Sequence, residues 1–222
     1  MTTGRVFLFS ILLLLIFPIA SNAGQLEDGT AAMDRGDYQT AYKLLYPLAE
    51  QGNATAQDFV GTMYYEGRGV EKDEVLAFDW FQKSADQEYP QAQYSLGAMY
   101  ISGVGVERDP QKGLSYITRA AQQGLEVAKQ TAYSLYLEEA QKGNIPAYHN
   151  VAYMCLHGWG GEADPQSCMK LLEVAAQNGY TKSAKALADI YKKGKFGVEI
   201  DEEKAALWKN FAENPPEAPN AN

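Results

Sequence analysis

The stretch that decides the fold is Ile101–Pro110, which reads ISGVGVERDP. It holds two glycines one residue apart, Gly103 and Gly105, followed by an Asp-Pro pair. Two interpretations of this loop compete. A glycine-rich loop can cradle a phosphate group with its backbone N–H groups, which would indicate an enzyme. Alternatively, the glycines end one helix and the Asp-Pro pair begins the next, which would indicate a corner between two helices.

The loop recurs along the chain at a fixed spacing. GTMYYEGRGVEKD at residues 61–73 matches GAMYISGVGVERD at residues 97–109, with identical residues 36 positions apart. Two further copies are CLHGWGGEADP at 155–165 and YKKGKFGVEID at 191–201, and the last has one extra residue before its aspartate. A phosphate loop would occur once, after a strand, whereas such a period is typical of a repeat array. The glycine loop is therefore predicted to be a helix–helix corner.

Each corner is predicted to contain the same parts. The first glycine ends a helix in the left-handed conformation, a valine packs against both helices, and an aspartate caps the next helix. The glycines are Gly67, Gly103, Gly158 and Gly194, the valines are Val70, Val106 and Val198, and the aspartates are Asp73, Asp109, Asp164 and Asp201. Helical spacing also predicts a buried stripe on each second helix, such as Ala77, Trp80 and Phe81.

The pattern A-x-A-x-x-x-L-G-x-x-Y-x-x-G-x-G-V-x-x-D resembles the Sel1-like repeat family, whose members are relatives of the tetratricopeptide repeats. The best copies run over residues 54–89 and 90–125, and the resemblance extends with departures to about Ala212. It implies an all-α fold, a right-handed superhelical solenoid of helix-turn-helix repeats. It does not specify an activity, because one fold hosts many functions.

The remaining segments complete a predicted organisation. Residues 24–53 are expected to form an N-terminal capping helix pair, and residues 213–222, which are proline-rich and polar, a disordered tail. The period fails over residues 126–144, where a corner is missing and a single irregular helix from Glu126 to Lys142 is expected. Repeats are expected at 54–89, 90–125, 145–180 and 181–212.

Residues 1–23 have the pattern of a secretory signal peptide. Arg5 precedes an apolar run over Val6–Phe17, and the small residues Ser21–Ala23 form a cleavage site. The run of 12 residues is shorter than the roughly 20 that span a bilayer, although an uncleaved anchor remains the alternative. The resemblance to a family with many exported bacterial members favours a Gram-negative periplasm, or secretion.

The charge of the chain excludes some partners. A net charge of -9 argues against binding to nucleic acids or docking on anionic membranes, because both require a basic surface. We therefore expect no nucleic-acid partner and, after signal cleavage, no stable membrane insertion.

The two cysteines, Cys155 and Cys168, flank the third corner and are expected to face each other across it. In an exported chain, a disulfide is the natural interpretation, and closing this short loop stabilises by about 2–3 kcal/mol on the entropic model. His149 and His157 lie nearby, but no closed set of metal ligands emerges. No metal and no cofactor is predicted.

One short motif suggests a different class of protein. SCMK at residues 167–170 matches the S-x-x-K nucleophile box of serine β-lactamases, although the partner boxes S-D-N and K-T-G are absent. A cell-wall-related enzyme or a glycan-binding module is therefore the alternative. The predicted function is a non-catalytic scaffold that holds a protein or peptide in the concave groove of the solenoid.

The surface of that groove is predicted from first-helix positions outside the core pattern of the repeat. Aromatic or apolar residues at these positions are Tyr65, Tyr94, Ile101, His149, Tyr153 and Leu156. Exposed aromatic side chains are typical binding hot spots, although these residues can instead pack between neighbouring repeats. In the last copy, Lys182, Lys185 and Lys192 would make one end of the groove basic.

Overall fold

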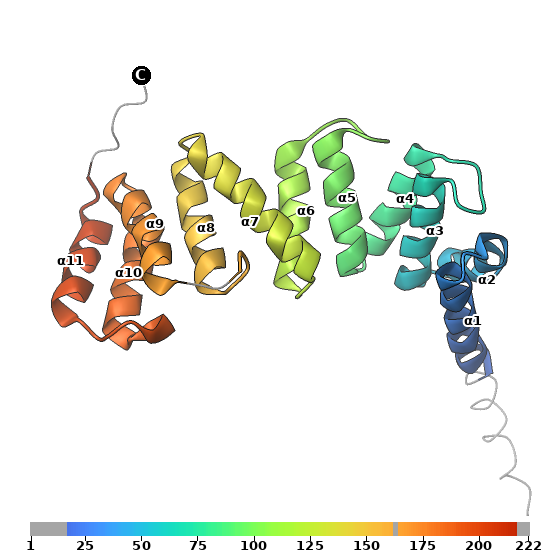
Figure 1. Ribbon diagram of the computed structural model, residues 1–222, viewed down its shortest axis with the longest axis horizontal. Helices are drawn as coiled ribbons and strands as arrows, with labels where there is room; N and C mark the ends of the chain where they lie inside the picture. The colour runs from blue at the N-terminus through green and yellow to red at the C-terminus, as the bar shows by residue number, and fades with distance from the viewer. Residues whose placement is uncertain (1–16, 162–163, 217–222) are drawn as a thin grey trace, which may run out of the picture. The chain divides into compact units, whose positions relative to one another are not determined.

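The computed structural model describes residues 17–161 and 164–216, and these residues are entirely helical apart from turns and loops (Figure 1). The chain divides into two compact units, residues 1–120 and 121–222. The first unit contains α1 (Phe17–Asp34), α2 (Tyr38–Glu50), α3 (Ala54–Glu66), α4 (Glu74–Ala85), α5 (Pro90–Ser102) and most of α6 (Pro110–Gln122). The second contains α7 (Glu126–Gln141), α8 (Ile145–Leu156), α9 (Pro165–Gln177), α10 (Thr181–Lys193), the 3-10 helix η1 (Lys195–Gly197) and α11 (Glu202–Glu213).

The corners follow the predicted design. Gly67, Gly103 and Gly194 end their helices with φ of 72°, 77° and 64°, in the region that glycine tolerates best. Asp73 accepts hydrogen bonds from the backbone N–H groups of Val75 and Leu76, at 3.1 and 2.9 Å. The third corner differs slightly, because α8 is capped by His157 and Gly158 comes one residue later.

In the first unit, the core lies between successive helices. Leu45 and Leu48 of α2 pack with Val60 and Met63 of α3 and with Trp80 of α4. A second cluster joins α4 to α5 through Ala77, Phe81, Leu96 and Met99. Gly61 and Gly97 allow close helix pairing, since a Cβ at Gly61 would lie 2.9 Å from the ring of Phe81. Each hairpin therefore buries its apolar stripe against the next hairpin.

The second unit has the same architecture with one addition. The single helix expected over Glu126–Lys142 is α7, which packs on α8 through Ala140, Ala147 and Val151. Residues of α8, α9, α10 and α11 share one cluster that includes Leu172, Leu187 and Trp208.

The predicted signal peptide lies largely outside the described residues. Of residues 1–23, only Phe17–Ala23 fall inside the described part of the chain, where they form the start of α1. The side chain of Asn22 donates a hydrogen bond to Gln51, the residue that follows α2, at 3.1 Å. Among the described residues, no helix is long and apolar enough to cross a membrane. Part of the predicted tail, residues 217–222, also lies outside the described residues.

Candidate functional site

In the first unit, the predicted strip residues differ in their exposure. Tyr65 is exposed at the end of α3, whereas Tyr94 and Ile101 are only partly exposed on α5. Ile101 packs inside its own hairpin, because its Cγ1 atom lies 2.6 Å from where a Cβ on Gly113 would stand. The repeat thus uses Ile101 for packing within its own hairpin.

In the second unit, three predicted residues meet in one groove. His149, Tyr153 and Leu156 of α8 line a cavity of about 230 Å³. The opposite wall comes from α10, with Ala186, Asp189 and Ile190, and the end of the groove is formed by Lys195 and Phe196 of η1. Leu172 of α9 also contributes to the lining. We call this cavity the α8–α10 groove.

An aromatic cluster borders the groove at the C-terminal end of α8. The ring of Tyr153 lies 4.1 Å from that of His157, and His157 meets Phe196 edge to face at 5.3 Å. Trp159 packs against the other side of Tyr153, with ring centroids 6.4 Å apart. Tyr153 is 49% exposed and Phe196 is 36% exposed, so this cluster presents open aromatic surface.

Phe196 was missed as a site residue by the sequence analysis. It lies in the corner that holds one extra residue, and that irregularity was the available signal. Its φ of 56° is uncommon for a residue with a bulky side chain. Strained conformations of this kind cluster at functional sites, where the surrounding structure holds them in place.

His149 closes the other end of the groove. Its Nδ1 atom lies 3.0 Å from the hydroxyl oxygen of Ser183 on α10, and its ring lies 5.3 Å from the ring of Tyr180. Burial, together with the positive charge of Lys182, lowers the pKa of the His149 imidazole. His149 is therefore a neutral hydrogen-bonding group at neutral pH.

One acidic residue lines the groove and is already paired. The carboxylate of Asp189 contacts Lys193 and Lys195, each at 2.6 Å. These hydrogen bonds lower the pKa of Asp189, so it remains charged. One carboxylate between two ammonium groups leaves an excess of positive charge beside the aromatic cluster.

The predicted disulfide is present. Cys155 at the end of α8 is bonded to Cys168 in the first turns of α9, with Cα atoms 5.6 Å apart. The bond encloses the corner that carries His157 and Trp159. It therefore joins the two helices at the point where the aromatic cluster begins.

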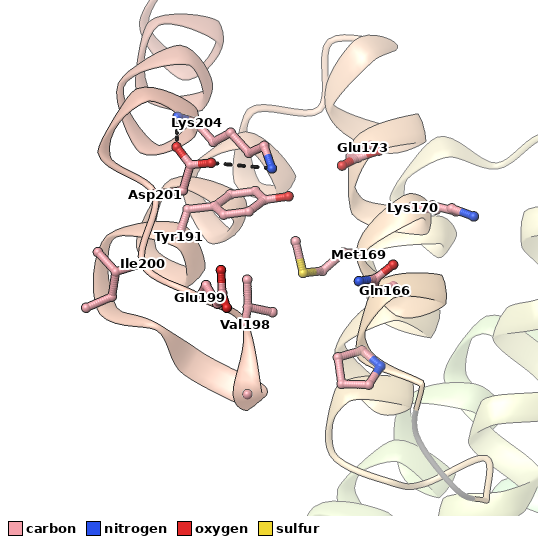
Figure 2. Close-up of a pocket in the computed structure, with 12 residues that line it drawn as sticks. Gln166, Met169, Lys170, Glu173, Tyr191, Val198, Glu199, Ile200, Asp201 and Lys204 are labelled. Carbon is pink, nitrogen blue, oxygen red and sulfur yellow. Dashed lines mark hydrogen bonds and ion pairs between the residues drawn. The ribbon is translucent and has the colours of Figure 1, made fainter.

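A second cavity, of about 620 Å³, lies between α9 and the last corner (Figure 2). In the first unit, Gly69 contacts the start of α2, and a Cβ there would lie 2.6 Å from the carbonyl oxygen of Tyr38. Gly197, the second glycine of the last corner, has no comparable neighbour within 4 Å, and the space beside Pro165 stays open. The extra residue thus leaves a gap where another corner makes contact.

The lining of this second cavity does not select one class of ligand. Figure 2 shows Met169 and Tyr191 beside the open space, with Lys204 paired to Asp201. Both signs of charge are represented, because Lys170 and Lys204 lie among three carboxylates. Those carboxylates belong to Glu173, Glu199 and Asp201.

The alternative of an S-x-x-K enzyme finds no structural support. The hydroxyl of Ser167 donates to the carboxylate of Asp164, so it takes part in capping α9. Within residues 17–161 and 164–216, no cluster of three His, Cys, Asp or Glu side chains could hold a metal ion.

Paired helices joined by glycine corners and stacked through shared apolar clusters define an α-solenoid of the helical-repeat class. The model of the Sel1 repeat matches residues 21–53, 54–89, 90–125, 145–180 and 181–208, and the chain belongs to this family. Sel1 repeats generally serve as protein–protein interaction scaffolds.

The chain is also similar to several known proteins. The chain is 33% identical over 75 residues to HRD3A of Arabidopsis thaliana, an ERAD-associated E3 ubiquitin-protein ligase component; the match covers 33% of this chain and 11% of HRD3A. A protective antigen of uropathogenic Escherichia coli strains, described as displaying an SLR fold, is 26% identical with a TM-score of 0.50. That match covers 87% of this chain and 46% of the antigen. A Sel1 repeat protein from Oxalobacter formigenes is 26% identical with a TM-score of 0.47, covering 86% and 83%. The chain therefore spans less than half the length of the first two relatives.

Proposed function

We propose that this protein is an exported, non-catalytic scaffold that binds a protein or peptide segment in the α8–α10 groove. The observation that carries the proposal is the open aromatic cluster of Tyr153, His157 and Phe196 beside an apolar cavity. Large aromatic side chains on a rigid support are the usual anchors of protein interfaces. The general role of Sel1 repeats as interaction scaffolds supports the same conclusion.

The groove is well suited to a peptide because its walls are held in place independently of a partner. The disulfide fixes the start of the third corner, and the hydrogen bond between His149 and Ser183 links α8 to α10. A preorganised surface loses less conformational entropy when it binds a partner.

Binding is tested with two groove variants, Tyr153→Ala and Phe196→Gly, and with Val174→Ala as control. Val174 is an exposed apolar residue of α9 that does not line the groove. The wild-type chain is used to capture partners by crosslinking, and dissociation constants are then measured for an identified partner. Each groove variant is expected to weaken binding at least about tenfold, whereas the control keeps wild-type affinity.

Phe196→Gly separates binding from folding. Glycine adopts a φ of 56° at little cost, so this variant is expected to keep or raise the melting temperature while it loses affinity. Unchanged binding by both groove variants would show that the partner docks elsewhere.

The export part of the proposal has a separate test. A disulfide that persists is typical of an oxidising compartment, and Cys155 and Cys168 form one here. Chain isolated from the periplasmic fraction is expected to begin at Gly24 and to resist alkylation until it is reduced. A chain that retains Met1 and has two free thiols would contradict export.

A further inference from the structure

The α8–α10 groove lies in the most basic part of an acidic chain. Residues 181–197, which form α10 and η1, contain five lysines and one aspartate, whereas the whole chain has a net charge of -9. The opposite helix, α8, holds no Asp, Glu, Lys or Arg. The charge that a groove ligand meets is therefore set by α10 and η1.

Two of these lysines mark the two ends of the groove. Lys182 lies in the first turn of α10, next to Ser183, so it stands at the end defined by the His149–Ser183 hydrogen bond. Lys195 lines the groove at the opposite end, next to Phe196 and His157. Lys182 is exposed and, within the part of the chain that the structure describes, makes no ion pair. Lys195 shares its single carboxylate, Asp189, with Lys193.

Between the two ends the lining is apolar and aromatic. Tyr153, Leu156, Leu172, Ala186 and Ile190 surround the middle of the groove. A cavity of about 230 Å³ is small enough that a single large side chain fills most of it. An apolar anchor is therefore expected at the centre of the ligand, with polar or charged groups on either side.

The spacing of the two lysines sets the length of the ligand. The ammonium group of Lys195 contacts Asp189, which lies seven residues after Lys182 on α10, so the two lysines stand roughly 10 Å apart along the helix axis at 1.5 Å per residue. An extended peptide rises about 3.3 Å per residue, so about three residues cover this distance.

We propose that the α8–α10 groove recognises an extended acidic segment in which one large apolar or aromatic side chain lies between two acidic residues about three positions apart. The central side chain enters the cavity beside Leu156 and Ile190, and the two carboxylates approach Lys182 and Lys195. This inference rests on the proposed function, because it specifies the partner of the same groove.

The neighbouring α10–α11 seam does not offer the same recognition. It contains Lys185, Lys192 and Lys209, but these are balanced by Asp189, Glu202 and Glu213. Lys185 and Lys192 thus line this seam and not the groove, and the seam carries both signs of charge.

The test is a selection from a random twelve-residue peptide library displayed on phage. The bait is the full mature chain, residues 24–222. Enriched sequences are read by deep sequencing, and one enriched peptide is labelled with fluorescein for anisotropy titrations. The expected result is enrichment of acidic peptides with a central aromatic or large aliphatic residue. Raising the salt concentration from 50 to 300 mM is expected to weaken binding of the labelled peptide.

Two matched pairs of substitutions separate the charge from the groove. Lys182→Gln with Lys195→Gln is expected to weaken the labelled peptide about five- to tenfold, whereas Lys43→Gln with Lys209→Gln, which removes the same charge elsewhere, is expected to leave it unchanged. The acidic-segment inference would be overturned if the enriched peptides were neutral or basic, or if the two double variants bound the labelled peptide equally well. In either case, loss of binding in Phe196→Gly would still support the groove as the binding site. A selection that enriches nothing, or peptides indifferent to Phe196→Gly, would overturn the proposed groove function itself.

Discussion

At the scale of single residues, Asp58 is the most unusual side chain of the first unit. It occupies the same repeat position on α3 that His149 occupies on α8. His149 has Ser183 as a partner in the next repeat, whereas the residue equivalent to Ser183 is Ala92, which offers no hydrogen bond. In the described structure, the Oδ1 atom of Asp58 is buried and has no hydrogen-bond partner, and burial raises the pKa of this carboxyl to about 7.

Ionisation of Asp58 therefore lowers the free energy of unfolding at alkaline pH. In the unfolded chain the carboxyl ionises near its ordinary pKa of 3.8, but in the folded chain only near 7. Folding thus becomes less favourable as the pH rises from about 4 to about 7, and the full penalty applies above that range. Asp58→Asn is expected to raise the free energy of unfolding by about 1–3 kcal/mol at pH 8 and by much less at pH 4.

Denaturant titrations of wild type and Asp58→Asn at both pH values measure this difference. Asp79→Asn, at an exposed position of α4, is the control and is expected to change stability by less than about 0.5 kcal/mol. An Asp58→Asn effect that is the same at pH 4 and pH 8 would mean that the carboxyl does not titrate in this range.

At the scale of elements, Gly69 can be compared with Gly197. They are the second glycines of the first and the last corner. Gly69 and Gly197 have nearly the same φ, 75° and 74°. A Cβ at Gly69 would lie 2.6 Å from the carbonyl oxygen of Tyr38, whereas Gly197 has open space around it. The two positions thus share backbone strain and differ in packing.

We expect Gly69→Ala to be far more costly than Gly197→Ala. An alanine in the left-handed region costs about 1–2 kcal/mol at either site, and the clash at position 69 adds about 1–3 kcal/mol more. Equilibrium unfolding of the two variants, followed by circular dichroism, gives the two free energies. Equal losses would indicate that the first corner can move away from α2 without cost.

The corners also show which features of the fold and of the groove can be predicted from the sequence. Glycine, valine and aspartate at fixed spacing predict the fold because each has a local role in ending, packing or starting a helix. The groove was predicted only in part, with His149, Tyr153 and Leu156. Phe196 was missed because side-chain direction in the irregular last corner depends on tertiary contacts rather than on spacing. Ile101 of α5 packs inside its hairpin, because Gly113 on α6 has no side chain to exclude it.

At the scale of the molecule, a repeat array needs a polar surface where its stacking stops. Within the first unit, Phe81 and Ala85 of α4 are buried against residues of α5, and in the second unit Leu172 and Ala176 of α9 are buried against residues of α10. The corresponding residues of α11 are Lys209 and Glu213. Both are exposed and form an ion pair at 3.8 Å.

Restoring the internal-repeat residues on α11 should therefore create a surface that associates with another copy. The double variant Lys209→Leu with Glu213→Ala extends the apolar floor of Ala205 and Ala212 in the α10–α11 seam, and exposed apolar patches of this kind drive association. Light scattering coupled to size-exclusion chromatography is expected to show dimers or larger species at micromolar concentration. Lys142→Leu with Glu138→Ala makes the same change in composition at the exposed ion pair between Glu138 of α7 and the following Lys142, and it should leave the oligomeric state of the wild type unchanged. Equal behaviour of the two double variants would mean that Lys209 and Glu213 have no special role in closing the array.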